Sequence, residues 1–289
     1  MLRRSILLTL LFLFSIFPCI AKLEAVKGKV EGGYNYWFYT PPEESSDSVG
    51  GKPLIIFLHG ASLCGSNLDQ VRRYGTISAI EKGREIDAFV IAPQNPGGSW
   101  KPEKIMKIVD YVSKHHDIDP NRLYVLGMSL GGYGTIDFTS VYHDRVAAAI
   151  AMCGGASRSN LEGLADVPLW IIHGTADRAV SVSQSDKVVE AVEKASDHRD
   201  GVDRLIYDRI PGMNHSQPAR IFYNPDVYDW LLSHSLDTPG RPINPTPEIS
   251  SAFLKGSYSG LNHSKGYKSP KKSSSSKKSK TKKRSGRKK

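Results

Sequence analysis

The stretch Leu123-Tyr124-Val125-Leu126-Gly127-Met128-Ser129-Leu130-Gly131 decides the fold of this chain. Its first half is an apolar run typical of a buried strand, and the residues from Leu130 to Thr135 suit the start of a helix. A strand that turns sharply into a helix forces the turn residue into a strained backbone conformation, and small residues two positions to either side let the two elements approach closely. The pattern therefore predicts that Ser129 is presented at the end of a strand as a nucleophile.

Short apolar runs alternate with helical patterns along the rest of the chain. Helices are expected over 102–115, 183–194 and 226–234, where apolar residues recur on one face. The runs expected to form strands are apolar throughout, which is typical of parallel strands that helices cover on both faces. They span 54–58, 88–92, 123–126, 146–152, 169–172 and 205–210. We therefore expect an α/β fold with a mostly parallel sheet.

The start of this domain has a different pattern. Residues 24–31 and 34–39 are expected to form an antiparallel hairpin around Gly32-Gly33, and a loop rich in Pro, Glu, Ser, Asp and Gly follows over 41–51. The hairpin and the later strand and helix units predict one catalytic domain over 22–237.

The first 21 residues predict a signal peptide. Arg3 and Arg4 precede a largely apolar run over 6–17, and Cys19 and Ala21 are small residues at the positions that a signal peptidase requires. Cleavage after Ala21 predicts an exported protein, periplasmic or secreted. The run is short for a membrane span, although an uncleaved N-terminal anchor is the alternative.

The net charge of +10 is concentrated at the C-terminal end. Residues 250–289 hold 14 Lys or Arg and no Asp or Glu, whereas 22–249 hold 23 basic and 29 acidic side chains. We expect 238–289, Pro-rich and then Ser- and Lys-rich, to be a disordered basic tail that cannot bury a core. The tail is either a solvated extension or a binder of polyanions or of an anionic envelope surface, and export argues against specific nucleic-acid binding.

Two cysteines follow the predicted signal peptide, Cys64 and Cys153. An exported protein permits one disulfide between them, and a buried free thiol is the alternative. Their spacing matches no metal site, and the sequence predicts no metal or other cofactor.

A serine nucleophile needs a base to take its proton and a carboxylate to orient that base. Asp177 follows the predicted strand 169–172, and His215 follows the predicted strand 205–210. Both loops are expected at the same edge of the sheet as Ser129, so we predict the triad Ser129, Asp177 and His215. The rival residues are His59 and His173, which directly follow strands and are expected to brace their loops, and Asp208, which lies within a strand.

Two further features are expected near the nucleophile. The backbone N–H groups of Leu130 and Ala61 are the predicted oxyanion hole, since one opens a helix and the other lies in the loop after the strand 54–58. Trp100 follows the Gly-rich segment 95–99, where it could stack on a sugar or an aromatic acyl group. The alternative is that it packs this loop onto the body.

With these motifs the chain resembles the α/β-hydrolase superfamily, in particular its secreted bacterial esterase branch. The branch is similar to carboxylesterases, dienelactone hydrolase-like proteins and feruloyl or acetyl-xylan esterases, and is also described as prolyl-oligopeptidase-like. The matching motifs are Leu58-His59-Gly60, Ala92-Pro93-Gln94, Asp119-Pro120-Asn121-Arg122, the turn around Ser129, His173-Gly174-Thr175-Ala176-Asp177 and Gly212-Met213-Asn214-His215. The resemblance implies an α/β-hydrolase fold, the same triad and no cofactor.

The resemblance leaves the substrate open. Two departures favour ester hydrolysis: the sequence shows no propeller domain such as prolyl oligopeptidases use, and serine stands where a dienelactone hydrolase has cysteine. We therefore expect an exported serine carboxylic ester hydrolase that forms an acyl-enzyme on Ser129, with acetyl or feruloyl esters of polysaccharides as substrates. The alternatives are an exopeptidase or amidase at the same site, and polyanion or envelope binding through the basic tail.

Overall fold

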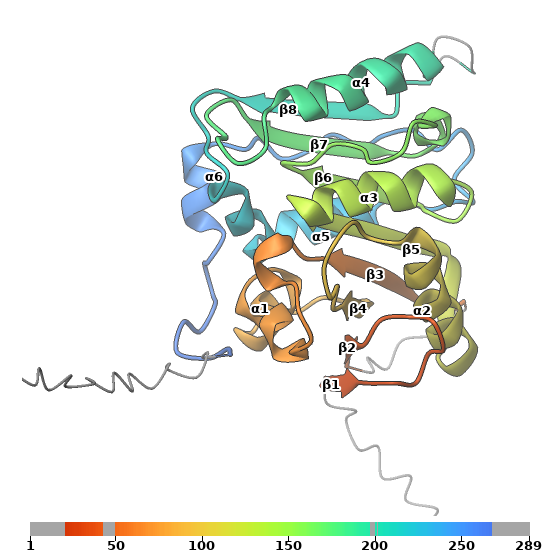
Figure 1. Ribbon diagram of the computed structural model, residues 1–289, viewed down its shortest axis with the longest axis vertical. Helices are drawn as coiled ribbons and strands as arrows, with labels where there is room; N and C mark the ends of the chain where they lie inside the picture. The colour runs from red at the N-terminus through yellow and green to blue at the C-terminus, as the bar shows by residue number, and fades with distance from the viewer. Residues whose placement is uncertain (1–20, 43–49, 197–199, 201, 268–289) are drawn as a thin grey trace, which may run out of the picture.

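The computed structural model describes residues 21–42, 50–196, 200 and 202–267. Within them, strands form one eight-stranded sheet in the order β1-β2-β4-β3-β5-β6-β7-β8 (Figure 1). The pairs β1/β2 and β2/β4 are antiparallel and the others are parallel, which confirms the predicted architecture. The strands are β1 Lys22–Val26, β2 Tyr36–Thr40, β3 Lys52–Leu58, β4 Phe89–Pro93, β5 Ile118–Met128, β6 Ala148–Met152, β7 Leu169–Gly174 and β8 Leu205–Ile210.

Helices cover both faces of this sheet (Figure 1). The α-helices are α1 Thr76–Glu81, α2 Pro102–His115, α3 Leu130–Val141, α4 Ser183–Ser196, α5 Pro225–Leu232 and α6 Ser251–Gly256. Four 3₁₀ helices complete the described chain: η1 Ala61–Leu63, η2 Leu68–Arg73, η3 Glu162–Asp166 and η4 Gln217–Tyr223. Helices α2, α3 and α4 pack on one face, and α1, α5 and α6 on the other.

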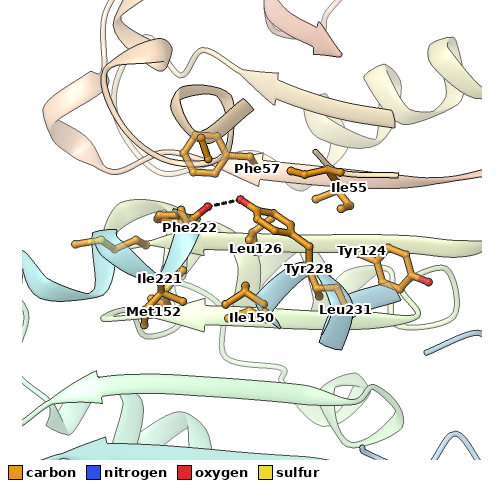
Figure 2. Packing of buried hydrophobic residues seen from close by; sticks show 14 of the residues in the cluster. Ile55, Phe57, Tyr124, Leu126, Ile150, Met152, Ile221, Phe222, Tyr228 and Leu231 are labelled. Atoms are coloured by element: carbon orange, nitrogen blue, oxygen red, sulfur yellow. Dashed lines mark hydrogen bonds between the residues drawn. The ribbon is translucent and has the colours of Figure 1, made fainter. Parts of the chain in front are cut away.

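The central strands are buried on both faces because their side chains alternate between two cores. Ile55 and Phe57 of β3 join the core under α1 and α5, whereas Leu54, Ile56 and Leu58 join the core under α2 and α3. Figure 2 shows the first of these cores, where the Tyr228 hydroxyl donates to the Phe222 carbonyl oxygen over 2.5 Å. Burial on both faces explains the uninterrupted apolar runs in the sequence.

Some predicted element bounds are wrong. The first strand ends at Val26 and not at 31, because Gly28 and Gly32 adopt positive φ angles of 63° and 68° and turn the chain. The strand expected from 146 begins at Ala148, since the Val146 N–H still bonds to the Tyr142 carbonyl oxygen at the end of α3. Helix α2 has the predicted bounds.

Residues 238–267 correct the prediction of a disordered tail from 238. This segment, which we call the C-terminal strap, contains α6 and contributes Ile249, Leu254 and Leu261 to the core under α1 and α5. The strap ends beside α1, where the Tyr267 N–H donates to Glu81 Oε2 over 3.2 Å. A few apolar residues in a polar stretch are enough to hold the segment against the core. The prediction was wrong because it relied on the average composition of the stretch. The rest of the predicted tail, 268–289, lies outside the described residues.

The predicted signal peptide also lies outside the described residues except for Ala21. Within the described part of the chain, no helix combines the length and apolar character that crossing a bilayer requires.

The strand order places two loops side by side at the carboxyl ends of β3 and β5. These strands are neighbours, but β3 leads to β4 on one side and β5 leads to β6 on the other. Adjacent parallel strands whose connections leave in opposite directions open a crevice at their carboxyl ends. The loop after Leu58 and the turn at Ser129 therefore face each other.

Candidate active site

Ser129 lies in a strained turn between β5 and α3. Its φ is 59° and its ψ is −123°, a backbone conformation that residues other than glycine rarely adopt. The flanking glycines are required by close packing: a Cβ on Gly127 would lie 2.4 Å from the Gly131 carbonyl oxygen, and one on Gly131 would lie 1.9 Å from the Leu58 carbonyl oxygen. The Ser129 N–H donates to the Met152 carbonyl oxygen over 2.8 Å, which holds the turn against β6.

The structure brings His215 and Asp177 to this serine from the loops after β8 and β7. His215 Nε2 lies 3.0 Å from Ser129 Oγ, and His215 Nδ1 lies 2.6 Å from Asp177 Oδ2. A carboxylate only accepts, so Nδ1 carries the proton and Nε2 is left to accept from the serine hydroxyl. The side chain of His215 is 27% exposed and that of Asp177 is fully buried. This arrangement can transfer a proton from the serine while the carboxylate stabilises the imidazolium.

Asp177 is held in its ionised form by its loop. Its Oδ1 accepts from the N–H groups of Ala179 and Val180 over 2.8 and 2.9 Å. Burial by itself would raise the pKa of the Asp177 carboxyl, but the hydrogen bonds from Val180, His215 and Ala179 outweigh it and the pKa is lowered.

The two N–H groups predicted to bind an oxyanion lie at helix starts. Ala61 is the first residue of η1 and Leu130 is the first residue of α3, so neither N–H has an intrahelical acceptor. The loop that carries Ala61 is close to the nucleophile, because a Cβ on Gly60 would lie 3.4 Å from Ser129 Cβ.

The peptide group between Gly60 and Ala61 is fixed by its neighbours. The Gly60 carbonyl oxygen lies 2.8 Å from His59 Nδ1 and accepts from the Leu63 N–H over 3.1 Å. In a trans peptide the C=O and the following N–H point in opposite directions. Holding the Gly60 carbonyl therefore sets the direction of the Ala61 N–H.

His59 and Tyr74 maintain this loop. The Asn95 N–H donates to His59 Nε2 over 3.0 Å, so the His59 proton is on Nδ1, facing the Gly60 carbonyl. Burial lowers the pKa of His59 to about 4, which keeps the ring neutral. The Gly60 N–H donates to Tyr74 Oη over 2.9 Å. Sequence reasoning missed Asn95, although it follows a quoted motif, and Tyr74, for which the sequence has no signal.

Trp100 is not a substrate contact, and the alternative that it packs its loop onto the body is correct. Its side chain is 2% exposed, and its Nε1–H donates to the His59 carbonyl oxygen over 3.3 Å. The ring packs edge-on against Tyr34, and a Cβ on Gly134 would lie 2.6 Å from it. Glycine-rich flanks suggested exposure, but the missing side chain at Gly134 makes room for the indole.

The remaining candidates have structural partners. Asp208 Oδ2 accepts from Trp170 Nε1 over 2.8 Å, and His173 is fully buried behind its loop. Cys64 and Cys153 are both free thiols, so the alternative of a disulfide does not hold.

One group in the described chain has metal-ligating atoms close together. Atoms of Cys153, His173 and Asp177 lie within 4.8 Å of one another. Burial raises the pKa of the Cys153 thiol, which disfavours the thiolate that binds metals, and both Asp177 oxygens already accept hydrogen bonds. The chemistry of these three residues is better suited to supporting the triad than to binding a metal ion.

An open depression lies beside His215 and leaves room for part of a substrate. Arg178 contributes a charged side chain to its lining, next to His215. The other lining residues are Ala176, Ala179, Gly212, Asn214 and Ser216.

Comparisons with known proteins agree with the fold. No family model matches the chain. It is 26% identical over 153 residues to a bifunctional acetylxylan esterase/xylanase of Neocallimastix patriciarum, and 26% identical over 121 residues to poly(3-hydroxyalkanoate) depolymerase C of Paucimonas lemoignei. These matches cover 48% and 36% of this chain, but only 21% and 28% of those relatives.

Two of the solved structures that are similar to this chain are esterases. A thermostable esterase has a TM-score of 0.57 and 24% identity, covering 74% of this chain and 63% of that one. The feruloyl esterase module of Clostridium thermocellum, in complex with sinapinate, has a TM-score of 0.51 and 14% identity, covering 79% and 91%. The chain has the α/β-hydrolase fold, and its site has the residue geometry of a serine hydrolase.

Proposed function

We propose that this protein is a serine hydrolase that cleaves carboxylic esters through an acyl-enzyme on Ser129. The observation that carries the proposal is the line of hydrogen bonds from Ser129 Oγ through His215 to Asp177, built on a strained turn beside the helix-start N–H groups of Ala61 and Leu130. The esterase names of the similar proteins support the same reaction.

The geometry supports a two-step reaction. His215 Nε2 takes the Ser129 proton as Oγ attacks the ester carbonyl carbon, and the N–H groups of Ala61 and Leu130 stabilise the oxyanion. Protonated His215 then gives this proton to the departing alkoxide, which leaves an acyl group on Ser129. In the second step His215 takes a proton from water as the water oxygen attacks the acyl carbon. The bond from that carbon to Oγ then breaks, His215 returns the proton to Ser129 Oγ, and the carboxylic acid leaves.

Esters carried by polysaccharides are the proposed substrates, acetyl or feruloyl groups in particular. The support comes from two relatives that are named an acetylxylan esterase and a feruloyl esterase. The test is a panel of acetylxylan, methyl ferulate and 4-nitrophenyl acetate, with 3-hydroxybutyrate oligomers and proline-containing anilides as competing substrates. A preference for the anilides would favour the exopeptidase or amidase alternative.

The Ser129→Ala variant tests the mechanism. It should lose 4-nitrophenyl acetate hydrolysis and fluorophosphonate labelling while it keeps the wild-type unfolding transition. Ser196→Ala is the matched control, because the Ser196 hydroxyl donates to the Val192 carbonyl oxygen of its own helix, away from the triad. Undiminished turnover in the Ser129 variant would contradict the proposal.

Export and tail binding are proposals that rest on the sequence. Export predicts a mature protein that begins at Lys22, which intact mass measurement of the secreted fraction tests. Polyanion binding predicts that the full chain, but not a chain ending at Tyr267, is retained on heparin at low salt and released at high salt. Equal retention of the two chains would remove the basic segment from the function.

A further inference from the structure

Three buried side chains that the proposed reaction does not use lie around Asp177. Cys153 and His173 are fully buried and Ser185 is 2% exposed. They come from the end of β6, from β7 and from the first turn of α4. Elements on both sides of the Asp177 loop therefore contribute to this group.

His173 contacts the carboxylate oxygen that His215 uses. His173 Nε2 lies 3.3 Å from Asp177 Oδ2 and 3.0 Å from the Val180 carbonyl oxygen. Both neighbours are acceptors only, so Nε2 must carry a proton. Asp177 Oδ2 therefore faces two imidazole N–H groups, one from the exposed base and one from the buried interior.

Ser185 contacts the other ring nitrogen of His173. His173 Nδ1 lies 2.8 Å from Ser185 Oγ, and the Ser185 hydroxyl donates to the Gly154 carbonyl oxygen over 3.0 Å. Burial lowers the pKa of His173 and favours the neutral ring. Because the single hydroxyl hydrogen of Ser185 points to the Gly154 carbonyl oxygen, the contact of Ser185 Oγ with Nδ1 fixes the position of the ring and not its tautomer.

The two oxygens of Asp177 are held by different parts of the fold. Oδ1 accepts only from the N–H groups of its own loop, Ala179 and Val180, so those bonds move with the loop. His173 belongs to β7 in the interior of the sheet. Its Nε2–H therefore ties the loop to a rigid strand through the Val180 carbonyl oxygen and lies 3.3 Å from the carboxylate oxygen Oδ2.

We propose that His173 is a positioning residue of the triad, which holds Asp177 Oδ2 in line with His215 Nδ1 and shares the charge of that oxygen. This role rests on the proposed function, because it acts at the same site. The titratable groups that face Asp177 are His215, His173 and the Cys153 thiol, and Asp186 of α4 acts on His173. Cys153 is a neutral partner here, since burial raises the pKa of its thiol.

The experiment compares His173→Leu, which removes the donor and keeps an apolar volume, with His173→Gln, whose side-chain amide can replace Nε2–H. His234→Leu is the matched control: His234 is also a buried histidine, but it bonds to Trp230 and Asn244, outside the triad. We expect kcat for 4-nitrophenyl acetate to fall about 10- to 100-fold in the leucine variant at nearly constant KM, and to stay within a few-fold in the glutamine variant.

A second readout distinguishes positioning from loss of stability. Without the second donor, Oδ2 stabilises the protonated His215 more strongly, so the acidic limb of the kcat/KM profile should move to higher pH in His173→Leu. The low-field proton NMR signal of the His215–Asp177 hydrogen bond should broaden in this variant and persist in His173→Gln and His234→Leu. If His173→Leu does not fold, Ser185→Ala takes its place, because it removes the hydroxyl that contacts Nδ1 and holds the His173 ring, and it should weaken the same signal and lower kcat.

Leucine or alanine variants with the wild-type kcat, pH profile and NMR signal would overturn the proposal, as would equal loss in the leucine and glutamine variants. Failure of the proposed function has a different signature. In that case wild-type protein hydrolyses none of the esters, while the NMR signal and the rate of fluorophosphonate labelling of Ser129 still report whether His173 positions Asp177.

Discussion

Replacing His59 should disable the oxyanion hole without touching the triad. His59 makes two hydrogen bonds with separate consequences: Nδ1–H holds the Gly60 carbonyl, and Nε2 accepts from the Asn95 N–H. His59→Leu removes both. His59→Asn keeps a donor near the position of Nδ1 and loses only the acceptor. The two variants therefore separate the effect on the Ala61 N–H from the effect on stability.

The magnitudes follow from what each lost bond leaves behind. A buried Asn95 N–H without an acceptor costs about 1–3 kcal/mol, so both variants should lose about 2 kcal/mol of the free energy of unfolding. The Gly60 carbonyl keeps the Leu63 N–H, so the peptide is loosened rather than freed. Complete loss of an oxyanion donor lowers kcat about 100- to 1,000-fold, and we expect about 100-fold in His59→Leu and less than about tenfold in His59→Asn.

The assay is kcat and KM for 4-nitrophenyl acetate, with urea unfolding of each variant measured in parallel. His59→Leu with the wild-type kcat would refute the role of the Gly60 carbonyl. Equal losses of kcat in the leucine and asparagine variants would show that the bond to Asn95, and not the bond to Gly60, maintains the site.

Three further results are expected. Ser129→Gly should have a free energy of unfolding about 1 kcal/mol above that of Ser129→Ala, because glycine adopts the positive φ without strain; urea unfolding in which alanine is equal or better would contradict this. His59 has a pKa of about 4 in the fold against 6.5 in the unfolded chain, so a contribution on the order of 3 kcal/mol is present above pH 6.5 and is lost as the pH falls towards 4. Parallel curves of unfolding free energy against pH for wild type and His59→Asn would refute that sign. Leu254→Ala should destabilise the protein by about 2 kcal/mol or more, with exposed Lys255→Ala as its control, and a loss below about 0.5 kcal/mol would show that the strap does not contribute to the core.

The parts of the fold that could be predicted are those in which a short sequence pattern is compatible with only one local structure. Apolar runs predicted the central strands correctly because both faces of the sheet are covered. The glycines around Ser129 indicated the turn because the close packing there leaves no room for a side chain. The chain order of Ser129, Asp177 and His215 was visible because each residue lies in the turn or loop that follows a strand. These signals are all short in sequence.

The features that could not be predicted depend on partners that are distant in sequence. Trp100 is buried because Gly134 makes room for it, and nothing around Trp100 indicates this. The strap was not predicted because its three apolar residues, among many polar ones, pack into a core that other segments form. The second histidine on Asp177 was visible only as a residue that braces a loop, since its contact depends on how that loop folds back over β7.

The strap also has a consequence for the order in which the protein folds. Ile249, Leu254 and Leu261 belong to the core under α1 and α5, but a ribosome makes them after every strand of the sheet. A nascent chain that has emerged only as far as residue 237 therefore leaves that face partly uncovered, with apolar surface open to solvent or to chaperones. Native packing of this core is therefore completed only after the strap has left the ribosome, which is later than for any strand of the sheet.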